Sequence, residues 1–414
     1  MSIMVQKFGG SSVADAERIK RVAKRVVETK RMGHKVVTVV SAMGDNTDHL
    51  ISLAKQVSDS PSKREMDMLL ATGEQVSIAL LAMAIQAMGE PVISLTGPQA
   101  GITTDNIHCK ARILDISSDR LHQELDQGRI VIVAGFQGAT INDDITTLGR
   151  GGSDTTAAAI AAALEAEMCE IYTDVDGVYA ADPRIVSNIK KLDYVSFDEM
   201  LELASLGAKV LEPRAVEFAK IYNVKLHVRS SFNNSKGTIV QEVSNMEMEK
   251  EIVVSGVAHD LNAVKMAVFG VPDIPGMACR IFKTLAEQSI NVDMIVQSAK
   301  VNGVNDIAFT IEKEDMEKTK DILEKIAKKM NARGMGCTEN IAKVSIVGAG
   351  MITHPGVAAD MFEALAEANI NLEMISTSEI KVSVIIDAKD CIKAVKTLVD
   401  KFNLQNEDVA NVAG

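Results

Sequence analysis

The sequence contains no tryptophan, and only 3% of its 414 residues are aromatic. Proteins that bind single-stranded nucleic acid usually stack the bases on aromatic side chains, so this way of binding is not expected. The formal net charge of −12 also disfavours nucleic acid and anionic membranes, because both are negatively charged. The first residues do not resemble a secretion signal, and no apolar run reaches the roughly 18 residues of a membrane span. We therefore expect a cytoplasmic protein with no nucleic acid and no membrane partner.

The five cysteines are scattered along the chain without any C-x-x-C pair, and the seven histidines are equally dispersed. A zinc site or a disulfide framework would be expected to show paired cysteines or clustered histidines. The sequence therefore predicts free thiols, a reducing compartment and no metal ion held by protein ligands alone.

Near its start the chain reads VQKFGGSSV, which places Lys7, Phe8, Gly9 and Gly10 at the end of an apolar, strand-like run. The two glycines can take positive φ and leave backbone NH groups open, and a helical pattern begins a few residues later. Such a strand, loop and helix can hold a phosphate, with the lysine as the positive charge. The stretch contains neither GxxxxGK[ST] nor GxGxxG, so an ordinary strand-to-helix turn is an equal alternative.

The first half of the chain, to about residue 243, alternates apolar runs with long helical patterns. Runs such as VVTVV and IVIVAGF are continuously apolar, as expected for strands that helices cover on both faces of a mainly parallel sheet. The charged stretch QEVSNMEMEKEIV lacks periodicity and is typical of a domain boundary. We predict an α/β domain over residues 1–245.

The second half contains an internal repeat. Residues 275–295 and 355–375 are identical at 11 of 21 positions without a gap. Each copy follows a strand pattern and precedes a strand and a helix, which predicts two βαββαβ, ferredoxin-like modules at residues 265–336 and 337–414. A strand near 252–264 is a candidate addition to the second module. The repeat has no likely nucleophile and indicates binding, while VGAGMITHPG within it lacks the third glycine of a dinucleotide fingerprint.

Two further motifs of the first half offer groups for a small charged substrate. SAMGDNT follows a buried strand, and TLGRGGSDTTAAAIAAAL leads into an alanine-rich helix. An arginine at position 150 can grip a carboxylate with two parallel hydrogen bonds, and an aspartate at position 154 can orient a group or cap the helix. The residues of these motifs are Ser41, Thr47, Arg150, Gly151, Gly152, Ser153 and Asp154.

The stretch TDVDGVYAADPR adds Thr173, Asp174, Tyr179 and Arg184 in a loop at the end of a strand. These side chains suit the base, ribose and phosphates of a nucleotide. Asp174 and Asp176 also resemble the start of a calcium loop, but the remaining ligands of that loop are absent from the sequence.

Together, KFGGSSV, LGRGGSDTTA and TDVDGVYAADPR resemble the aspartokinases of the amino-acid kinase family, of the monofunctional bacterial type with two C-terminal ACT domains. The resemblance extends along essentially the whole chain. It implies an aspartate kinase (EC 2.7.2.4) that converts ATP and L-aspartate into ADP and 4-phospho-L-aspartate, with Mg²⁺ bound through the ATP phosphates. This is the first step towards lysine, threonine, methionine and diaminopimelate.

The resemblance assigns a role to each motif. Lys7, Gly9, Gly10 and Asp154 would act on the transferred phosphoryl group. Aspartate would be held by Ser41, Thr47, Glu74, Arg150, Gly151, Gly152 and Ser153, and the nucleotide by Lys7, Phe8, Gly9, Gly10, Thr173, Asp174, Tyr179, Arg184 and Lys209. From the residues alone, Glu74 reads equally well as a solvated acid on a helix, and Lys209 as a surface lysine. The aspartate side chain, with a pKa near ~3.9, is already ionised at neutral pH and needs no general base.

The resemblance also implies feedback inhibition by lysine, threonine or both, at an interface between two ACT modules of different subunits, in a homo-oligomer or an α2β2 assembly. In each copy a Pro-Gly turn opens a helix, whose free NH groups can receive an α-carboxylate. Asp273 could accept a lysine ammonium or be only a turn residue. The predicted effector residues are Asp273, Ile274, Pro275, Gly276, Ala278, Asn291, Asp293, Thr353, His354, Pro355, Gly356, Val357, Asn369, Ile370, Asn371, Ser376, Thr377, Ser378 and Glu379. Met246 and Met248 could start a separate regulatory subunit, although ordinary linker methionines are favoured.

Two alternatives stay open. Another amino-acid kinase, of the acetylglutamate or glutamate 5-kinase type, would share the sheet and the glycine loop but would not be expected to carry the tandem repeat. A non-catalytic amino-acid sensor would need no catalytic groups, and the presence of Lys7, Arg150 and Asp154 argues against it.

Overall fold

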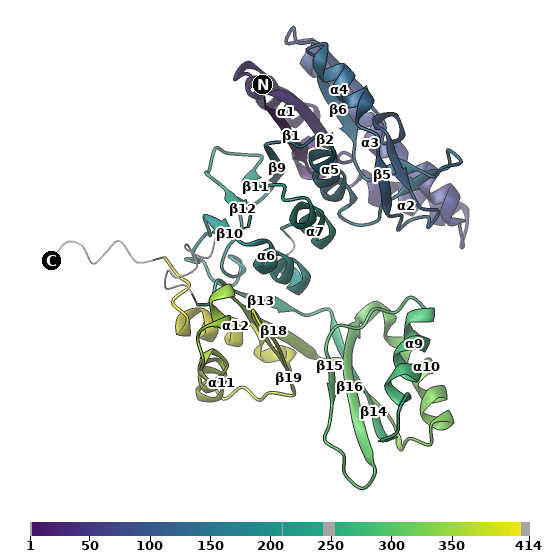
Figure 1. Ribbon diagram of the computed structural model, residues 1–414, viewed down its shortest axis with the longest axis vertical. Helices are drawn as coiled ribbons and strands as arrows, with labels where there is room; N and C mark the ends of the chain where they lie inside the picture. Colours follow the sequence, from purple (N-terminus) through teal and green to yellow (C-terminus); the bar gives the residue numbers. More distant parts are fainter. Residues whose placement is uncertain (1, 209, 243–252, 407–414) are drawn as a thin grey trace, which may run out of the picture. The chain divides into compact units, whose positions relative to one another are not determined.

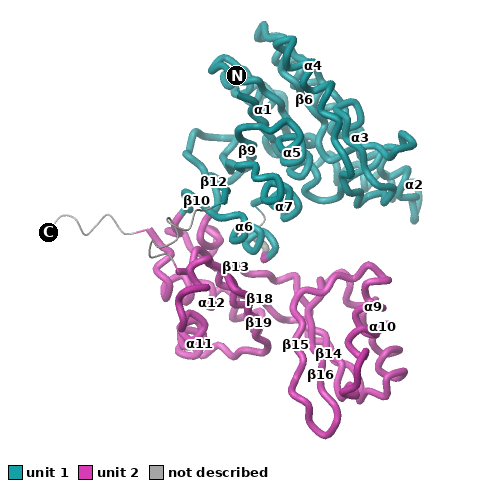
Figure 2. Tube along the Cα trace, in the orientation of Figure 1, with its two compact units in different colours: residues 1–178, 191–205, 209–244 teal, residues 179–190, 206–208, 245–414 magenta. Residues whose placement is uncertain are grey.

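The computed structural model describes residues 2–208, 210–242 and 253–406, and it divides the chain into two units (Figure 1, Figure 2). Unit 1 comprises residues 1–178, 191–205 and 209–244, and unit 2 comprises residues 179–190, 206–208 and 245–414. The predicted boundary methionines Met246 and Met248 lie outside the described residues.

Unit 1 is the α/β part of the chain, as its alternating sequence pattern predicts. Its helices are α1 (Ala16–Arg31), α2 (Asn46–Val57), α3 (Lys63–Gln86), α4 (Asp119–Asp126), α5 (Gly152–Ala163), α6 (Phe197–Leu203) and α7 (Pro213–Ile221). Its strands are β1 (Ile3–Phe8), β2 (Lys35–Val40), β3 (Val92–Leu95), β4 (Ile102–Thr104), β5 (Ile113–Ile116), β6 (Ile130–Ala134), β7 (Gln137–Ala139), β8 (Ile145–Thr147), β9 (Met168–Thr173), β10 (Tyr194–Val195), β11 (Leu226–Ser230) and β12 (Thr238–Val240).

The main sheet of unit 1 has eight strands in the order β10-β12-β11-β9-β1-β2-β6-β3. All its neighbouring strands are parallel except β11 and β12, which form an antiparallel hairpin. The central strands β2 and β6 are buried along almost their whole length, which explains their continuously apolar sequences. The prediction of a mainly parallel sheet between helices is therefore confirmed.

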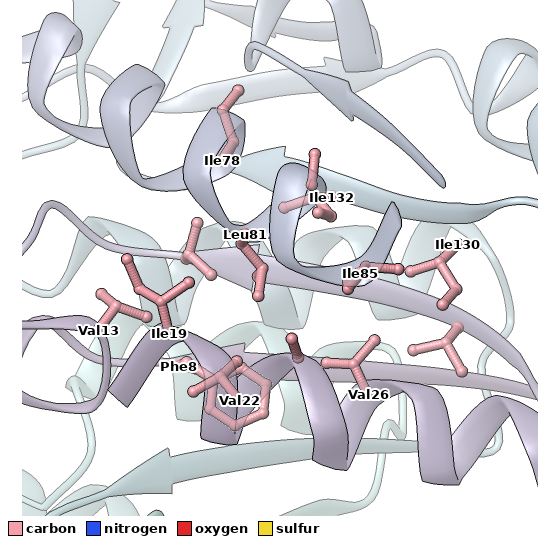
Figure 3. Packing of buried hydrophobic residues seen from close by; sticks show 14 of the residues in the cluster. Phe8, Val13, Ile19, Val22, Val26, Ile78, Leu81, Ile85, Ile130 and Ile132 are labelled. Atoms are coloured by element: carbon pink, nitrogen blue, oxygen red, sulfur yellow. The ribbon is translucent and has the colours of Figure 1, made fainter. Parts of the chain in front are cut away.

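Alternate residues of β1 face the two layers of helices. One face belongs to a hydrophobic cluster that joins β1 with α1 and α3 and includes Phe8, Val22, Leu81 and Ile132 (Figure 3). The other face packs against α5, whose alanines bring its backbone close to β1, β2 and β9. Because the side-chain period of a strand is two, Lys7 points away from the Phe8 cluster and towards α5.

Helix α3 is long and apolar enough, by length and composition alone, to cross a membrane. The expectation concerned uninterrupted apolar runs, and α3 is not such a run, because Glu74 lies within its apolar stretch. The buried face of α3 packs in the core of unit 1 through Ile78, Leu81 and Ile85. Its position is that of a core helix.

A second, four-stranded sheet in unit 1, in the order β5-β4-β7-β8, was not anticipated from the sequence. Its strands are only three or four residues long, too short to give a recognisable periodic pattern. Strand β8 packs against α3 and leads directly into the loop that contains Arg150.

Unit 2 contains the two repeated modules. Its helices are α9 (Met277–Glu287), α10 (Met316–Lys329), α11 (Val357–Glu367) and α12 (Cys391–Lys401). Its strands are β13 (Gly256–Asp260), β14 (Ala263–Pro272), β15 (Ile295–Gln297), β16 (Val304–Glu312), β17 (Gly334–Thr338), β18 (Ile341–Val347), β19 (Met374–Ser378) and β20 (Lys381–Asp387).

Each module forms a four-stranded antiparallel sheet with two helices. The first sheet has the order β15-β16-β14-β17, which is a complete βαββαβ module. The second has the order β13-β18-β20-β19, and its fourth strand comes from the segment that precedes the first module. The strand considered near 252–264 therefore pairs with β18, in place of a strand after α12.

The two modules of this chain contact each other within unit 2. Met294 of the first module and Met374 of the second occupy equivalent positions of the repeat and lie in one shared hydrophobic cluster. Two ion pairs cross the same contact: Lys343 Nζ lies 2.5 Å from an oxygen of Asp293, and Lys265 pairs with Glu373. These contacts join two modules of one chain, and the interface expected between modules of different subunits stays a prediction.

Candidate active site

A pocket of about 240 Å³ lies at the carboxyl ends of β1 and β2 and the amino end of α5. Ligands of open α/β sheets bind at this edge. The pocket brings together residues from four of the sequence motifs. It is lined by Lys7, Gly10, Ser41, Ala42, Gly44, Thr47, Glu74, Phe136, Gly149, Arg150, Gly151, Gly152, Ser153 and Asp154.

Lys7 and Asp154 form the charged centre of this pocket. Lys7 Nζ lies 2.5 Å from Asp154 Oδ1, and both side chains are about nine-tenths buried. Lys7 extends from β1, and Asp154 occupies the first turn of α5, where the helix dipole favours a negative charge. The pair holds the ammonium group of Lys7 in one place beside the pocket.

The glycine loop after β1 is shaped by close packing and not by positive φ. A Cβ atom on Gly10 would lie 2.9 Å from the carbonyl oxygen of Ala42, so this position admits only glycine. Gly9 has φ −71°, and its N–H donates to the carbonyl oxygen of Tyr172. The expectation that both glycines leave their NH groups open is therefore wrong for Gly9.

Glu74 is buried on α3, with only 3% of its surface exposed. Its Oε1 accepts a hydrogen bond from the Ala42 N–H at 3.1 Å. Gly73 allows this approach, because a Cβ there would lie 2.9 Å from the Ala42 Cβ. Burial raises the pKa of Glu74 to about 7, although the Ala42 hydrogen bond lowers it. The alternative interpretation of Glu74 as a solvated acid is wrong.

We expect Glu74→Gln to weaken the pH dependence of stability of the substrate-free protein. Between about pH 4.5 and 7 the folded chain keeps a proton on Glu74 that the unfolded chain releases, so the stability from this group falls as pH rises. Glutamine cannot lose a proton. Between pH 5 and pH 8 the variant should therefore lose less stability than the parent, by on the order of 1–3 kcal/mol in urea unfolding. Equal losses in both proteins would contradict the raised pKa.

Arg150 lies in an exposed loop between two glycines with positive φ, Gly149 at +82° and Gly151 at +63°. Gly151 is the N-cap residue of α5, so the loop delivers Arg150 to the amino end of that helix. Among the described residues, no carboxylate forms an ion pair with Arg150. Its guanidinium is therefore available to an anion that enters the pocket.

The predicted nucleotide residues are divided between the two units. Phe8 is buried, stacked on the ring of Tyr172 with 4.7 Å between ring centroids, and it does not line the pocket. Thr173 and Asp174 lie at the end of β9 in unit 1, whereas Tyr179 and Arg184 belong to unit 2. The side chain of Lys209 lies outside the described residues.

Several pocket residues were missed by the sequence reasoning. Gly44 lies within SAMGDNT, and its N–H donates to the carbonyl oxygen of Gly10. Phe136 and Gly149 also line the pocket. Outside the pocket lining, Glu212 packs against Gly151, and burial together with the charge of Asp154 raises the pKa of Glu212. The proximity of these residues depends on how loops from different strands meet, which no local motif encodes.

The predicted effector turns begin the first helix of each module. Gly276 and Gly356 have φ values of 95° and 104° and are the N-cap residues of α9 and α11. The exposed residues at or near these turns are Asp273, Ile274, Pro275, Ala278, Thr353, His354 and Pro355. Both turns thus present an accessible helix N-terminus, as the repeated Pro-Gly predicts.

Two of the predicted effector acids already have partners in this chain, and two of the predicted apolar residues are buried. Asp273 lies 3.0 Å from Lys300 Nζ, and Asp293 pairs with Lys343. Val357 and Ile370 are buried apolar residues, so no side-chain contact with an effector is expected from them.

The remaining predicted effector residues surround the edge strands. Strands β15 and β19 begin at Ile295 and Met374, and residues 290–293 and 370–373 precede them. Asn291 and Asn371 are exposed in these preceding segments, and Asn369, just before the second segment, is exposed as well. Ser376, Thr377 and Ser378 lie on edge strand β19, followed by Glu379.

Comparisons with known proteins decide the family. The model of the amino acid kinase family matches residues 2–230, and that of the ACT domain matches residues 267–326 and 344–402. The aspartokinase of Mycolicibacterium smegmatis is 52% identical over 416 residues, which cover 100% of this chain and 99% of that protein. The chain belongs to the aspartokinase family. The resemblance found in the motifs is thereby confirmed.

Solved aspartokinases share the fold over nearly the whole chain. E. coli aspartokinase III in complex with aspartate and ADP, in its R-state, is 25% identical, with a TM-score of 0.82, and the match covers 96% of this chain and 99% of that one. The same protein in complex with lysine and aspartate, in its T-state, has a TM-score of 0.74 at 25% identity, over 97% of this chain and 99% of that one. Aspartokinase architecture therefore accounts for both units.

Proposed function

We propose that this chain transfers the γ-phosphoryl group of ATP to the side-chain carboxylate of L-aspartate. The observation that carries the proposal is that Lys7, Glu74 and Arg150 meet in one pocket of a chain that belongs to the aspartokinase family. The pocket offers two cations, Lys7 and Arg150, for two anionic substrates, and it offers Glu74 as an acid that is not paired with either cation. A pure sensor of amino acids would not need the buried Lys7–Asp154 pair.

The charges of the pocket match those of aspartate. In the proposed complex, Arg150 binds the α-carboxylate and Glu74 receives the α-ammonium group. Ser41, Thr47 and Ser153 line the same pocket and can supply hydroxyls to the substrate. A bound ammonium favours the ionised form of Glu74, so aspartate binding releases a proton from Glu74 below about pH 7. Substrate affinity should accordingly weaken as the pH falls.

The transfer itself needs positioning and charge stabilisation more than proton transfer. An oxygen of the substrate carboxylate forms a bond to the γ-phosphorus while the bond from that phosphorus to the bridging oxygen breaks and leaves ADP. The carboxylate is already ionised, so no base is needed. Lys7, fixed by Asp154, stabilises the charge on the phosphoryl oxygens, and the amino end of α5 adds its dipole.

We propose that Mg²⁺ binds with ATP, mainly through the phosphates. In the described ranges no three His, Cys, Asp or Glu side chains cluster so that they could hold a metal ion. The acids that line the pocket are Asp154, which is paired with Lys7, and Glu74, which is bonded to Ala42. This donor set suits an ion that arrives with the nucleotide and neutralises its phosphate charge. The loop after β9, with Thr173 and Asp174, is the proposed edge of the nucleotide site.

We also propose feedback regulation through unit 2. E. coli aspartokinase III was solved with lysine bound, and the same ACT-type modules occur here. The accessible helix N-termini at Gly276 and Gly356 can receive the α-carboxylate of an amino acid. Threonine as an effector, an assembly of several subunits through the ACT modules, and a cytoplasmic location are further predictions.

Arg150→Ala should mainly weaken aspartate binding. The guanidinium has no other partner among the described residues, so its removal should leave the fold intact. Loss of a charge-assisted hydrogen-bonded contact should raise the aspartate KM about tenfold while the ATP KM changes little. Arg64→Ala, which removes an exposed arginine at the start of α3, serves as the control. A raised ATP KM with an unchanged aspartate KM would assign the loop to the nucleotide instead.

The proposed function is tested by measuring ADP release from ATP with three acceptors: L-aspartate, L-glutamate and N-acetyl-L-glutamate. We expect ADP release with aspartate and little with the others. Preference for glutamate or N-acetylglutamate would support the alternative kinases. No release with any acceptor, together with calorimetric binding of amino acids, would support the sensor.

A further inference from the structure

We propose that Asp67 is a positioning residue that fixes the loop carrying Arg150 and thereby sets the affinity for the amino-acid substrate. This inference rests on the proposed function, because Arg150 is assigned there to aspartate. It concerns a residue outside the pocket, on the helix that also supplies Glu74. The role was not visible in the sequence, where Asp67 is one of many acids on a helical pattern.

Asp67 is completely buried on α3, with 0% of its surface exposed. A buried carboxylate is costly unless several hydrogen bonds satisfy it, and Asp67 has four close contacts. Both of its oxygens accept the Cys109 N–H at 3.1 Å, Oδ1 accepts the Thr147 hydroxyl at 2.5 Å, and Oδ2 lies 2.7 Å from His108 Nδ1. These partners all lie outside α3.

The partners belong to two segments that lie side by side. His108 and Cys109 are in the loop between β4 and β5, and Thr147 ends β8. The two segments are also joined directly, because the Ala111 N–H donates to the carbonyl oxygen of Thr147 at 2.9 Å. Arg214 of α7 donates to the carbonyl oxygens of Ala111 and Leu148 and bridges the same segments. Asp67 thus holds together two segments that touch at Thr147.

The Arg150 loop begins where these contacts end. Leu148 and Gly149 are the only residues between Thr147 and Arg150. Gly149 has φ +82°, and a Cβ added there would lie 3.2 Å from the carbonyl oxygen of Cys109. The loop that contains Cys109 therefore packs directly against the turn at Gly149 and supports it. A shift of the Cys109 loop would therefore move Arg150. The exposed Arg150 side chain has no partner among the described residues that would hold it in place.

Helix α3 connects the Cys109 loop to the pocket, because it carries both Asp67 and Glu74. Asp67 and Glu74 are seven residues apart, which places them on the same face of the helix, two turns apart. Glu74 contacts the loop after β2 through the Ala42 N–H, and Asp67 contacts the support of the Arg150 loop. One rigid helix therefore sets the distance between the two groups proposed to bind the ammonium and the carboxylate of the substrate.

The test compares Asp67→Asn and Thr147→Val with the parent enzyme. In Asp67→Asn, an NH₂ group replaces one of the two oxygens that accept the Cys109 N–H, and an NH₂ group cannot accept this hydrogen bond. In Thr147→Val, the hydroxyl that donates to Asp67 is lost while the shape of the side chain is kept. We expect the aspartate KM to rise about tenfold in Asp67→Asn and less in Thr147→Val, with the ATP KM unchanged. Hydrogen exchange of amides in residues 107–111 and 147–152 should accelerate about tenfold, since their local protection depends on these bonds.

Glu124→Gln is the matched control, because Glu124 is also a buried acid in unit 1 but anchors Arg129 next to β6. It should alter neither the aspartate KM nor exchange in the two segments. If Asp67→Asn fails to fold, the aspartate KM and the hydrogen exchange of Thr147→Val still test the proposal. The proposal is overturned if both variants lower turnover without any change in aspartate KM, or if exchange is unchanged. A parent protein that is inactive on aspartate would overturn the proposed function separately. The exchange measurement would then still test whether Asp67 holds the Arg150 loop in place.

Discussion

Lys7→Ala is expected to lower the turnover of aspartate phosphorylation by a factor on the order of 10² to 10³, the usual loss when one preorganised charge-stabilising group is removed. Lys7 extends from β1 into the pocket, and its ammonium lies 2.5 Å from Asp154 Oδ1. The KM for aspartate should change much less, because the lost charge acts on the phosphoryl oxygens. Steady-state kinetics with both substrates varied measure this.

Removal of Lys7 also leaves the carboxylate of Asp154 buried without its cation, so folding must be checked independently. Thermal unfolding and circular dichroism serve this purpose. Lys35→Ala is the control, because Lys35 begins β2 at the opposite end of the sheet and pairs with Asp126. A folded Lys7→Ala variant with near-normal turnover would remove Lys7 from the mechanism and return the glycine loop to an ordinary turn.

Asp273→Ala and Thr377→Ala are expected to relieve inhibition by end-product amino acids while uninhibited turnover stays nearly unchanged. An effector inhibits only if it prefers a less active state, and a coupling of ~1 to 3 kcal/mol gives a roughly 5- to 150-fold effect. Asp273 lies at the exposed turn before α9, where its present partner Lys300 could be replaced by the ammonium of a ligand. Thr377 offers a hydroxyl on edge strand β19.

Inhibition curves with lysine and threonine, alone and together, measure this effect. Asp321→Ala, on the exposed side of α10, is the control and should be inhibited like the parent. If neither amino acid inhibits the parent enzyme or binds to it in calorimetry, the regulatory assignment is wrong. The kinase assignment would survive that result, because the pocket of unit 1 does not depend on it.

Much of the fold could be predicted because its signals are local. The continuously apolar strands predict a covered parallel sheet, and the Pro-Gly turns predict the starts of α9 and α11. The fourth strand of the second module was harder to place. β13 precedes the first module in the sequence but pairs with β18 in the second. When two paired strands lie this far apart in the sequence, no local sequence pattern indicates that they pair.

Most residues of the site could be predicted individually from the sequence, but the contacts between them could not. Lys7 and Asp154 were each singled out, yet their direct pairing follows from how α5 packs on β1. Glu74 could not be told from a solvated acid until its burial was known. Asp67 was overlooked for the same reason, since its partners lie 41 or more residues away in the sequence. Burial and long-range contacts decide such roles.

The most direct test of the aspartate kinase assignment is to trap the acyl phosphate product with hydroxylamine in the presence of ATP and Mg²⁺, and to compare L-aspartate with L-glutamate as acceptors. The pocket proposed here predicts hydroxamate with aspartate, little or none with glutamate, and a loss of most of the signal in Lys7→Ala. Equal or greater hydroxamate formation with glutamate, or none with aspartate by a folded protein, would contradict the account.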